Sequence, residues 1–437
     1  MSGLVKSVNG CPEMLPMVLH NSPIPGGSLS VVVAVTVVLM LALVQVFDFV
    51  GEGISDRRSI IEVSGELRAA VMRLQRDLDG LTVTTLPPAE PQAGEGYLEI
   101  IEGHLSDRLP VDGDPTVNSL LGDTDDLLMF TARSEGEPFV GRYGANTIES
   151  NVAEIVWWIG SDPANSGKRH LYRRVFLVRP DLNDSTGIIS NAAISSFVSV
   201  NDISVRLAQS GALVANSLAD LTKRENRFGH DHDRNNFPHR VLAFVPDVNR
   251  YNEDLILFQP LAFDVRVYDP NAPMYQDPQN PGAILSPGDR GLYDPVAQGF
   301  IRRMNGAYVD LYYERFLRLE DAPDTYFFAG PGHRKSQLHV TDIGGYATYD
   351  TWSLHYEYDG RDQDFDDKLD EGTNGLDDQF GTGLDDLGST GVDDFGERET
   401  SPPYPYPLRG LQVKVRVYEP DSQTVHQVTV TGDFLPE

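Results

Sequence analysis

Residues 28–46 read Ser-Leu-Ser-Val-Val-Val-Ala-Val-Thr-Val-Val-Leu-Met-Leu-Ala-Leu-Val-Gln-Val, a run of 19 residues without a charged side chain. At about 1.5 Å of rise per residue, a helix of this length covers roughly the 30 Å hydrocarbon core of a bilayer. A strand would be unusually long, and a cleaved secretory signal would need more basic residues before the run than Lys6 and His20. The run therefore predicts a transmembrane helix.

The segment that follows continues as an amphipathic helix. Its apolar residues recur at three- and four-residue steps between Ser59 and Leu81, opposite a face of acidic and arginine side chains. Gly51 and Gly53 mark a flexible point between the two halves. The apolar positions are Ile60, Ile61, Val63, Leu67, Ala70, Val71, Leu74, Leu78 and Leu81. Such a stripe is expected to pack on a globular head.

The composition limits the possible partners. The 437 residues include 65 acidic and 35 basic side chains, a net charge of −30. So acidic a chain is repelled by nucleic acid and by anionic lipid surfaces. Its single cysteine, Cys11, excludes an internal disulfide and cysteine-based zinc or iron–sulfur centres.

Beyond Pro87 the sequence is rich in strand patterns, and Gly and Pro separate them. In residues 412–417 valines alternate with Gln, Lys and Arg, as in an antiparallel strand with one wet face. Residues 212–225 indicate a short helix. The other predicted strands are 97–101, 127–132, 153–159, 170–178, 255–268, 348–358 and 424–431. We therefore predict an α+β fold, a long N-terminal helix (transmembrane, then amphipathic) packed on an antiparallel β-sheet head with large loop insertions.

The predicted organisation has six parts. They are a leader (1–27), a transmembrane helix (28–50), an amphipathic spine helix (51–86), a β-rich head (87–358) with a Pro-rich insertion at 269–295, an acidic Gly/Asp repeat insertion (359–400) and C-terminal strands of the head (401–437).

The acidic insertion is a candidate cation site. Residues 359–397 hold 14 acidic and 2 basic side chains, a net charge of 2 − 14 = −12. Gly-Leu-Asp-Asp occurs at 375–378 and 383–386, and Gly-Val-Asp-Asp at 391–394. Paired carboxylates behind a glycine suit Ca²⁺, although a solvated acidic loop explains the pattern equally. The candidate ligands are Asp377, Asp378, Asp385, Asp386, Asp393 and Asp394, with a weaker set in Asp362, Asp364 and Asp366.

Catalytic motifs are not evident. His230, His232 and Asp233 have spacing reminiscent of a metal-dependent hydrolase, but no further histidine cluster completes that site. The sequence has no G-x-S-x-G elbow and no glycine-rich phosphate loop in a strand-to-helix context. We therefore predict that the protein is not an enzyme, with an anchored hydrolase as a minor alternative.

Taken together, these features resemble those of type IV pilin-like proteins, and more narrowly the J-type minor pseudopilin of type II secretion systems. The order of the segments carries the resemblance. They are the helix end Leu67–Leu78, Gly122-Asp123 with the strand 128–133, the strands 153–158 and 171–174, the strand 261–268, Trp352 and the closing strand 407–413.

The resemblance implies a processing site after Gly27, so that Ser28 would be the first and methylated residue. The family has a glutamate at the fifth mature position, where this chain has Val32. The K-type tip pseudopilin also lacks that glutamate and is therefore an alternative.

The resemblance also implies a function and a location. We expect a structural subunit that initiates or caps a short periplasmic filament for protein export. It would be a single-pass inner-membrane protein with its head in the periplasm. Its partners would be other minor pseudopilins, a major pseudopilin and secreted cargo. The alternative from another class is a membrane-anchored, calcium-dependent adhesin or binding module.

Overall fold

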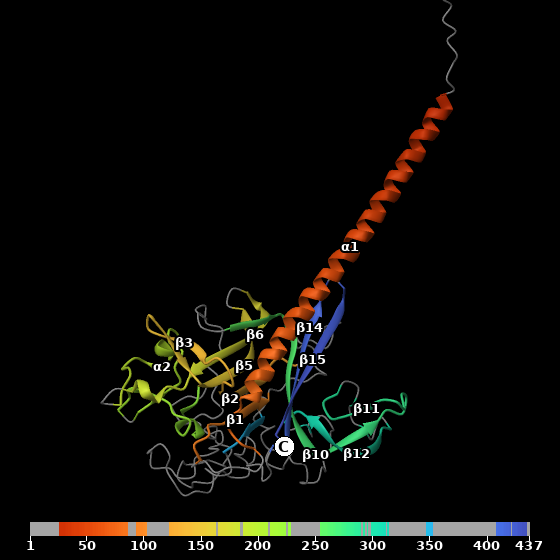
Figure 1. Ribbon diagram of the computed structural model, residues 1–437. Coiled ribbons are helices and arrows are strands. Elements are labelled where there is room, and N and C mark those ends of the chain that lie inside the picture. The colour runs from red at the N-terminus through yellow and green to blue at the C-terminus, as the bar shows by residue number, and fades with distance from the viewer. Residues whose placement is uncertain are drawn as a thin grey trace, which may run out of the picture. The chain divides into compact units, whose positions relative to one another are not determined.

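Figure 1 shows the computed structural model of the protein. The chain divides into two compact units, Met1–Arg58 and Ser59–Glu437, and each is described by itself. The described residues are 26–85, 93–102, 122–162, 165–183, 187–208, 210–223, 226–228, 254–289, 292, 295, 299–311, 313, 347–352, 408–420 and 422–434.

Helix α1 (Gly26–Asp79) has residues in both units. In the first unit, the side chains described between Val31 and Val44 are mostly large, apolar and exposed. In the second unit the helix is amphipathic. Leu67, Leu74 and Leu78 are buried there at steps of seven and four residues, which places them on one face.

The end of α1 is tied to a strand of the head. The N–H of Arg133 donates to the Gly80 carbonyl at 2.6 Å, and the N–H of Thr82 donates to the Thr131 carbonyl at 3.0 Å. A Cβ on Gly80 would collide with the carbonyl oxygen of Arg133. This close approach requires a residue without a side chain directly after the helix.

The larger sheet has six antiparallel strands in the order β13-β1-β2-β5-β6-β9. They are β13 (Ala347–Asp350), β1 (Leu98–Glu102), β2 (Leu127–Arg133), β5 (Val152–Asp162), β6 (Asn165–Leu177) and β9 (Asp254–Phe258). β1 and β2 are almost wholly buried, so neither sequence alternates between apolar and polar residues; β2 begins with an apolar run, whereas β1 buries Glu99 and Glu102 as well.

The second sheet has five strands in the order β11-β10-β14-β15, and β12 also pairs with β10. They are β10 (Pro260–Gln276), β11 (Ile284–Leu285), β12 (Ile301–Val309), β14 (Gly410–Glu419) and β15 (Thr424–Asp433). The valines of β14 are buried in alternation with half-exposed polar residues. The two-residue alternation therefore determines which side chains of β14 face the core.

Smaller elements complete the described part of the head. β3 (Phe139–Tyr143) pairs with β4 (Asn146–Ser150), and β7 (Val205–Leu207) pairs with β8 (Leu213–Ala215). The short helices are α2 (Ile194–Val198), η2 (Pro180–Leu182) and η3 (Asp220–Thr222).

The main core joins both sheets and the last turns of α1. Leu67, Leu74 and Leu78 belong to the same apolar cluster as residues of β1, β2, β5, β10 and β14. Trp157 of β5 stacks on Phe263 of β10, with ring centroids 6.4 Å apart and planes 11° apart. The two sheets therefore share one core.

The α+β prediction is wrong, because the structure is mostly β, with 47% strand and 21% helix. The predicted arrangement of a long helix packed on a sheet is also corrected. The core is built chiefly of strands, and α1 contributes to it through a few side chains between Leu67 and Leu78. In the sequence, the helical periodicity of residues 59–81 is a stronger local signal than the patterns of the many short strands. These strands nevertheless build most of the fold.

The membrane prediction is also wrong. Among the described residues, no helix combines the length and apolarity that a bilayer crossing requires, including the one that contains residues 28–46. The predicted single-pass inner-membrane location with a periplasmic head is therefore contradicted. The uncharged run forms part of a longer helix that becomes charged from Asp48 onward.

Several strand predictions are confirmed, and one helix prediction is wrong. The strands predicted at 127–132, 412–418 and 424–431 correspond to β2, β14 and β15. The predicted helix over 212–225 is instead strand β8 followed by the 3-10 turn η3. The first part of the Pro-rich stretch 269–295 continues β10 as far as Gln276.

We predict that Gly80→Ala destabilises the protein by about 2 kcal/mol, because the new Cβ would push the Arg133 carbonyl away from its hydrogen-bonded position. Chemical denaturation followed by circular dichroism measures the change.

Gly65→Ala is the matched control. Gly65 lies inside α1 with no heavy atom within 4 Å of an added Cβ, so alanine there should stabilise the protein by up to about 1 kcal/mol. Equal effects of the two substitutions would contradict the described junction.

Candidate functional site

The structure does not test the sites predicted from the sequence. All nine aspartates of the predicted calcium sites lie outside the described residues, as do His230, His232 and Asp233. Gly27 and Ser28, the predicted processing residues, lie in the first turn of α1, and their side chains are not described.

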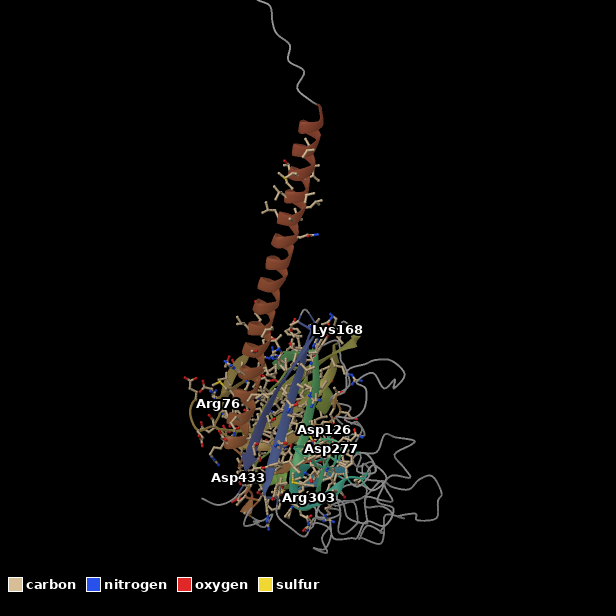
Figure 2. All side chains as sticks on the ribbon, turned by 90° about the vertical axis from the view of Figure 1, so that its right-hand side faces the viewer. Arg76, Asp126, Lys168, Asp277, Arg303 and Asp433 are labelled. Carbon is tan, nitrogen blue, oxygen red and sulfur yellow. The ribbon has the colours of Figure 1, made fainter. Side chains whose placement is uncertain are left out.

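A different acidic cluster lies inside the head. Glu102 is the last residue of β1, and Asp123 and Asp126 lie on the segment that leads into β2. One carboxylate oxygen from each lies within 4.8 Å of the others, and all three side chains are buried. Figure 2 shows Asp126 among the strands of the head.

Main-chain contacts with the second sheet hold this segment. The N–H of Phe263 donates to the main-chain carbonyl of Asp123 at 2.8 Å, and the N–H of Val265 donates to Oδ2 of Asp126 at 2.8 Å. The Arg169 guanidinium donates to the hydroxyl of Thr124. β10 therefore fixes the backbone on which the carboxylates stand.

The Asp123 side chain is in an unusual electrostatic position. Neither of its carboxylate oxygens has a hydrogen-bond partner among the described residues. Burial raises the pKa of its carboxyl well above the usual range, and the nearby carboxylates of Asp126, Asp125, Asp264 and Asp310 raise it further. An ionised Asp123 therefore lacks the compensation that buried charges normally have.

A second cluster of charged side chains lies near Asp123 and contains both carboxylates and basic groups. The buried Arg266 guanidinium contacts the carboxylates of Asp264 at 2.9 Å, Asp310 at 3.0 Å and Asp289 at 3.0 Å. Lys414 lies 3.5 Å from Asp264. Three carboxylates thus face two cations, which leaves no excess positive charge for Asp123.

Three further buried ion pairs, made by two arginines, connect distant segments of the head. Arg227 contacts Glu99 at 2.9 Å and Asp350 at 2.6 Å, with no exposed side-chain surface on the arginine. Asp77 of α1 accepts from Arg173 at 2.6 Å and from the Trp157 indole N–H at 2.9 Å. These pairs join segments that are distant in sequence and serve a structural role.

Glu154 is a buried carboxyl held by three donors. The Tyr97 hydroxyl lies at 2.8 Å, the Ser204 hydroxyl at 2.6 Å and the Phe228 N–H at 2.8 Å. Burial raises its pKa despite these hydrogen bonds, which act in the opposite direction. Its polar atoms are occupied, so it is a poor candidate for a catalytic acid.

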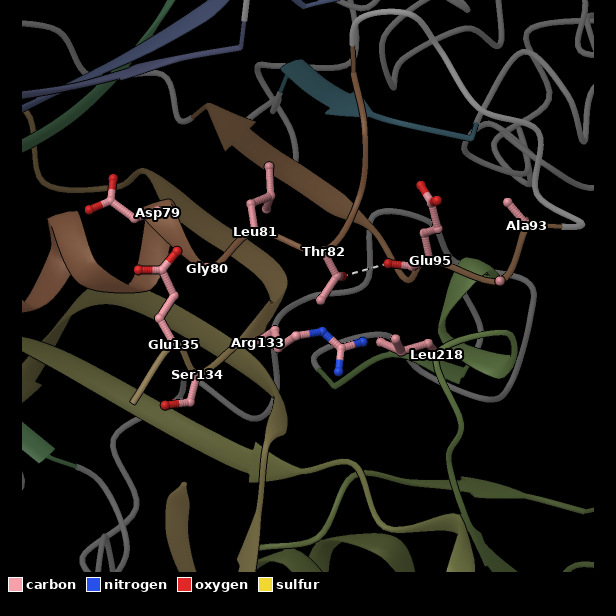
Figure 3. A pocket seen from close by; sticks show the side chains of 11 residues that line it. Asp79, Gly80, Leu81, Thr82, Ala93, Glu95, Arg133, Ser134, Glu135 and Leu218 are labelled. Carbon is pink, nitrogen blue, oxygen red and sulfur yellow. Dashed lines mark hydrogen bonds between the residues drawn. The ribbon is translucent and has the colours of Figure 1, made fainter. Parts of the chain in front are cut away.

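An open pocket of about 500 Å³ lies where α1 ends (Figure 3). The hydroxyl of Thr82 donates to the main-chain carbonyl of Glu95 at 2.5 Å, and the hydroxyl of Ser134 donates to that of Glu137 at 2.5 Å. Its charged side chains are those of Asp79, Glu95, Arg133 and Glu135. Among these lining residues, no hydroxyl is paired with a base that could activate it.

Comparisons with known protein families, curated proteins and solved structures yield no match. They lend no support to the pilin, secretion or calcium-binding roles expected from the sequence, and the described helices contradict the membrane role. The pilin and secretion expectations depend on weak similarities of separate segments. The calcium expectation depends on the acidic repeat, which lies outside the described residues and is not tested.

We predict that Arg227→Met destabilises the head by about 3–5 kcal/mol, since it leaves Glu99 and Asp350 buried without their shared cation. Equilibrium unfolding in urea measures the loss.

Arg179→Met removes a guanidinium from the largely exposed pair with Asp181 and should cost less than about 1 kcal/mol. If Arg227→Met cost no more than this control, the buried pair would not have the structural role described.

Proposed function

We propose that this protein is a non-enzymatic structural subunit that assembles with further copies of itself through the apolar part of α1. One observation carries the proposal. Between Val31 and Val44, ten large apolar side chains are each more than half exposed in the single chain. Contiguous apolar surface of this kind is typical of interaction sites.

The exposed apolar side chains surround the helix rather than forming one stripe. The five consecutive residues from Val37 to Leu41 are each 51–65% exposed. Successive residues of an α-helix point about 100° apart, so five in a row cover its full circumference. A helix that is apolar on all sides belongs in an interior.

Full coverage requires more than one neighbouring helix. A single partner would cover one side and leave the opposite residues in water, so the proposed assembly contains at least three helices. Copies of the same segment suit this arrangement, because it carries no charge between Gly26 and Phe47 that would have to be buried.

The net charge of −30 opposes the association of copies. Salt weakens this repulsion, while the apolar contact remains. Assembly through α1 should therefore strengthen as the salt concentration rises, unlike an assembly held by surface ion pairs.

The pocket at the end of α1 supports a role without catalysis. Its described hydroxyls donate to main-chain carbonyls, and the nearby buried carboxylate Asp77 is held in an ion pair. The proposal keeps the role of a structural subunit that the sequence indicates, and it includes neither a membrane nor a secretion system.

We predict that the full-length protein forms oligomers of three or more chains, and that Leu39→Glu converts them to monomers because it places a charge inside the apolar bundle. Light scattering coupled to size-exclusion chromatography, at low and high salt, measures the molar mass.

Val140→Glu is the matched control, because Val140 is equally exposed but lies on β3 in the second unit. It should leave the oligomer intact. A wild-type protein that stays monomeric at all concentrations and salt levels would refute the proposal.

A further inference from the structure

We propose that Glu102, Asp123 and Asp126 bind a hard divalent cation of the Mg²⁺ or Mn²⁺ class inside the head. The site is distinct from the acidic repeat of residues 359–397, and it does not depend on assembly through α1. Oxygen ligands from carboxylates are those that such cations prefer.

The geometry suits three ligands on one ion. With metal–oxygen bonds of about 2.1 Å, neighbouring oxygens of an octahedron lie about 3.0 Å apart and opposite ones about 4.2 Å apart. The three carboxylate oxygens already lie within 4.8 Å of one another. Small side-chain rotations would therefore bring them onto a common ion, and about three positions would remain for water.

The environment of the Asp123 side chain is an indication of a bound ligand that is independent of the distances between the oxygens. Its side chain has no exposed surface, and both its oxygens are without a hydrogen-bond partner among the described residues. The main chain at Asp123 is fixed, because its carbonyl accepts from the N–H of Phe263. A buried carboxylate on a fixed backbone that points at two others requires either a cation or a proton.

Among the described residues, the nearby arginine and lysine do not supply the compensation that Asp123 lacks. Arg266 and Lys414 contact Asp264, Asp289 and Asp310 rather than Asp123. Burial and the neighbouring carboxylates raise the pKa of Asp123, so a proton is the competing occupant. A bound divalent cation would displace that proton and stabilise the ionised form.

The position of the cluster indicates what the ion would do. Glu102 ends β1 of the larger sheet, whereas Asp123 and Asp126 are hydrogen-bonded to β10 of the second sheet. An ion shared by these residues would link the two sheets directly. It would therefore stabilise the head rather than perform a reaction.

Mn²⁺ binding to the full-length, chelator-treated protein tests the proposal. Electron paramagnetic resonance measures free Mn²⁺ during a titration, and circular dichroism measures the melting temperature with and without Mn²⁺ or Mg²⁺. We expect one site that binds much more tightly than the remaining acidic surface, and a higher melting temperature when it is filled.

Asp123→Asn and Glu102→Gln should each weaken that site at least tenfold and abolish the rise in melting temperature. Asp123→Asn should not destabilise the metal-free protein, because a neutral amide avoids the cost of burying or protonating the carboxylate. This variant therefore keeps the test valid if Glu102→Gln folds poorly. Glu135→Gln, which removes an exposed carboxylate, is the control and should bind Mn²⁺ like the wild type.

The proposal is overturned if the wild type binds Mn²⁺ no more tightly than Asp123→Asn, or if neither cation raises its melting temperature. Either result would assign a proton, rather than a metal ion, to the cluster. The oligomeric state has no bearing on these readouts, so failure here is distinguishable from failure of the proposed assembly.

Discussion

Compensation of buried charge is the constraint on which the head of this protein depends. The head buries several carboxylates where its two sheets share one core, and a buried charge needs a partner there. Arg227 provides one for Glu99 and Asp350, Arg173 for Asp77, and Arg266 for Asp264 and Asp310. These arginines lie between segments that the apolar core brings together.

The Asp123 side chain departs from that pattern, because neither of its oxygens has a hydrogen-bond partner among the described residues. The three carboxylates of its cluster lie at the junction of the two sheets, where hydrogen bonds from β10 hold the main chain. The arginine and lysine nearby contact other aspartates. Asp123 therefore needs either a proton or an additional positive charge, and the proposed divalent cation held by the three carboxylates would supply that charge.

Local sequence patterns were enough to locate several strands but not to define the fold class. The Val-Lys-Val-Arg-Val alternation of β14 is a local signal that matches its burial pattern. β3 and β4 are short and largely exposed, so they have no apolar signal to detect. β10 continues through Pro270 and Pro273, residues that argue against a strand when the sequence is considered alone.

The candidate site could not be predicted because its members are joined only by the fold. Glu102 ends β1, and Asp123 and Asp126 lie on the segment that leads into β2, so the pairing of these two strands is what brings the three carboxylates together. The run Asp123-Thr124-Asp125-Asp126 is the available signal for the acidic cluster. The longer repeat at 375–394 is more regular and is therefore the stronger signal of the two.

Anomalous X-ray diffraction from crystals of the full-length protein grown with Mn²⁺ tests the central claim most directly. We expect an anomalous peak at bonding distance from carboxylate oxygens of Glu102, Asp123 and Asp126. Well-ordered density for the three carboxylates without such a peak would contradict the proposed ion.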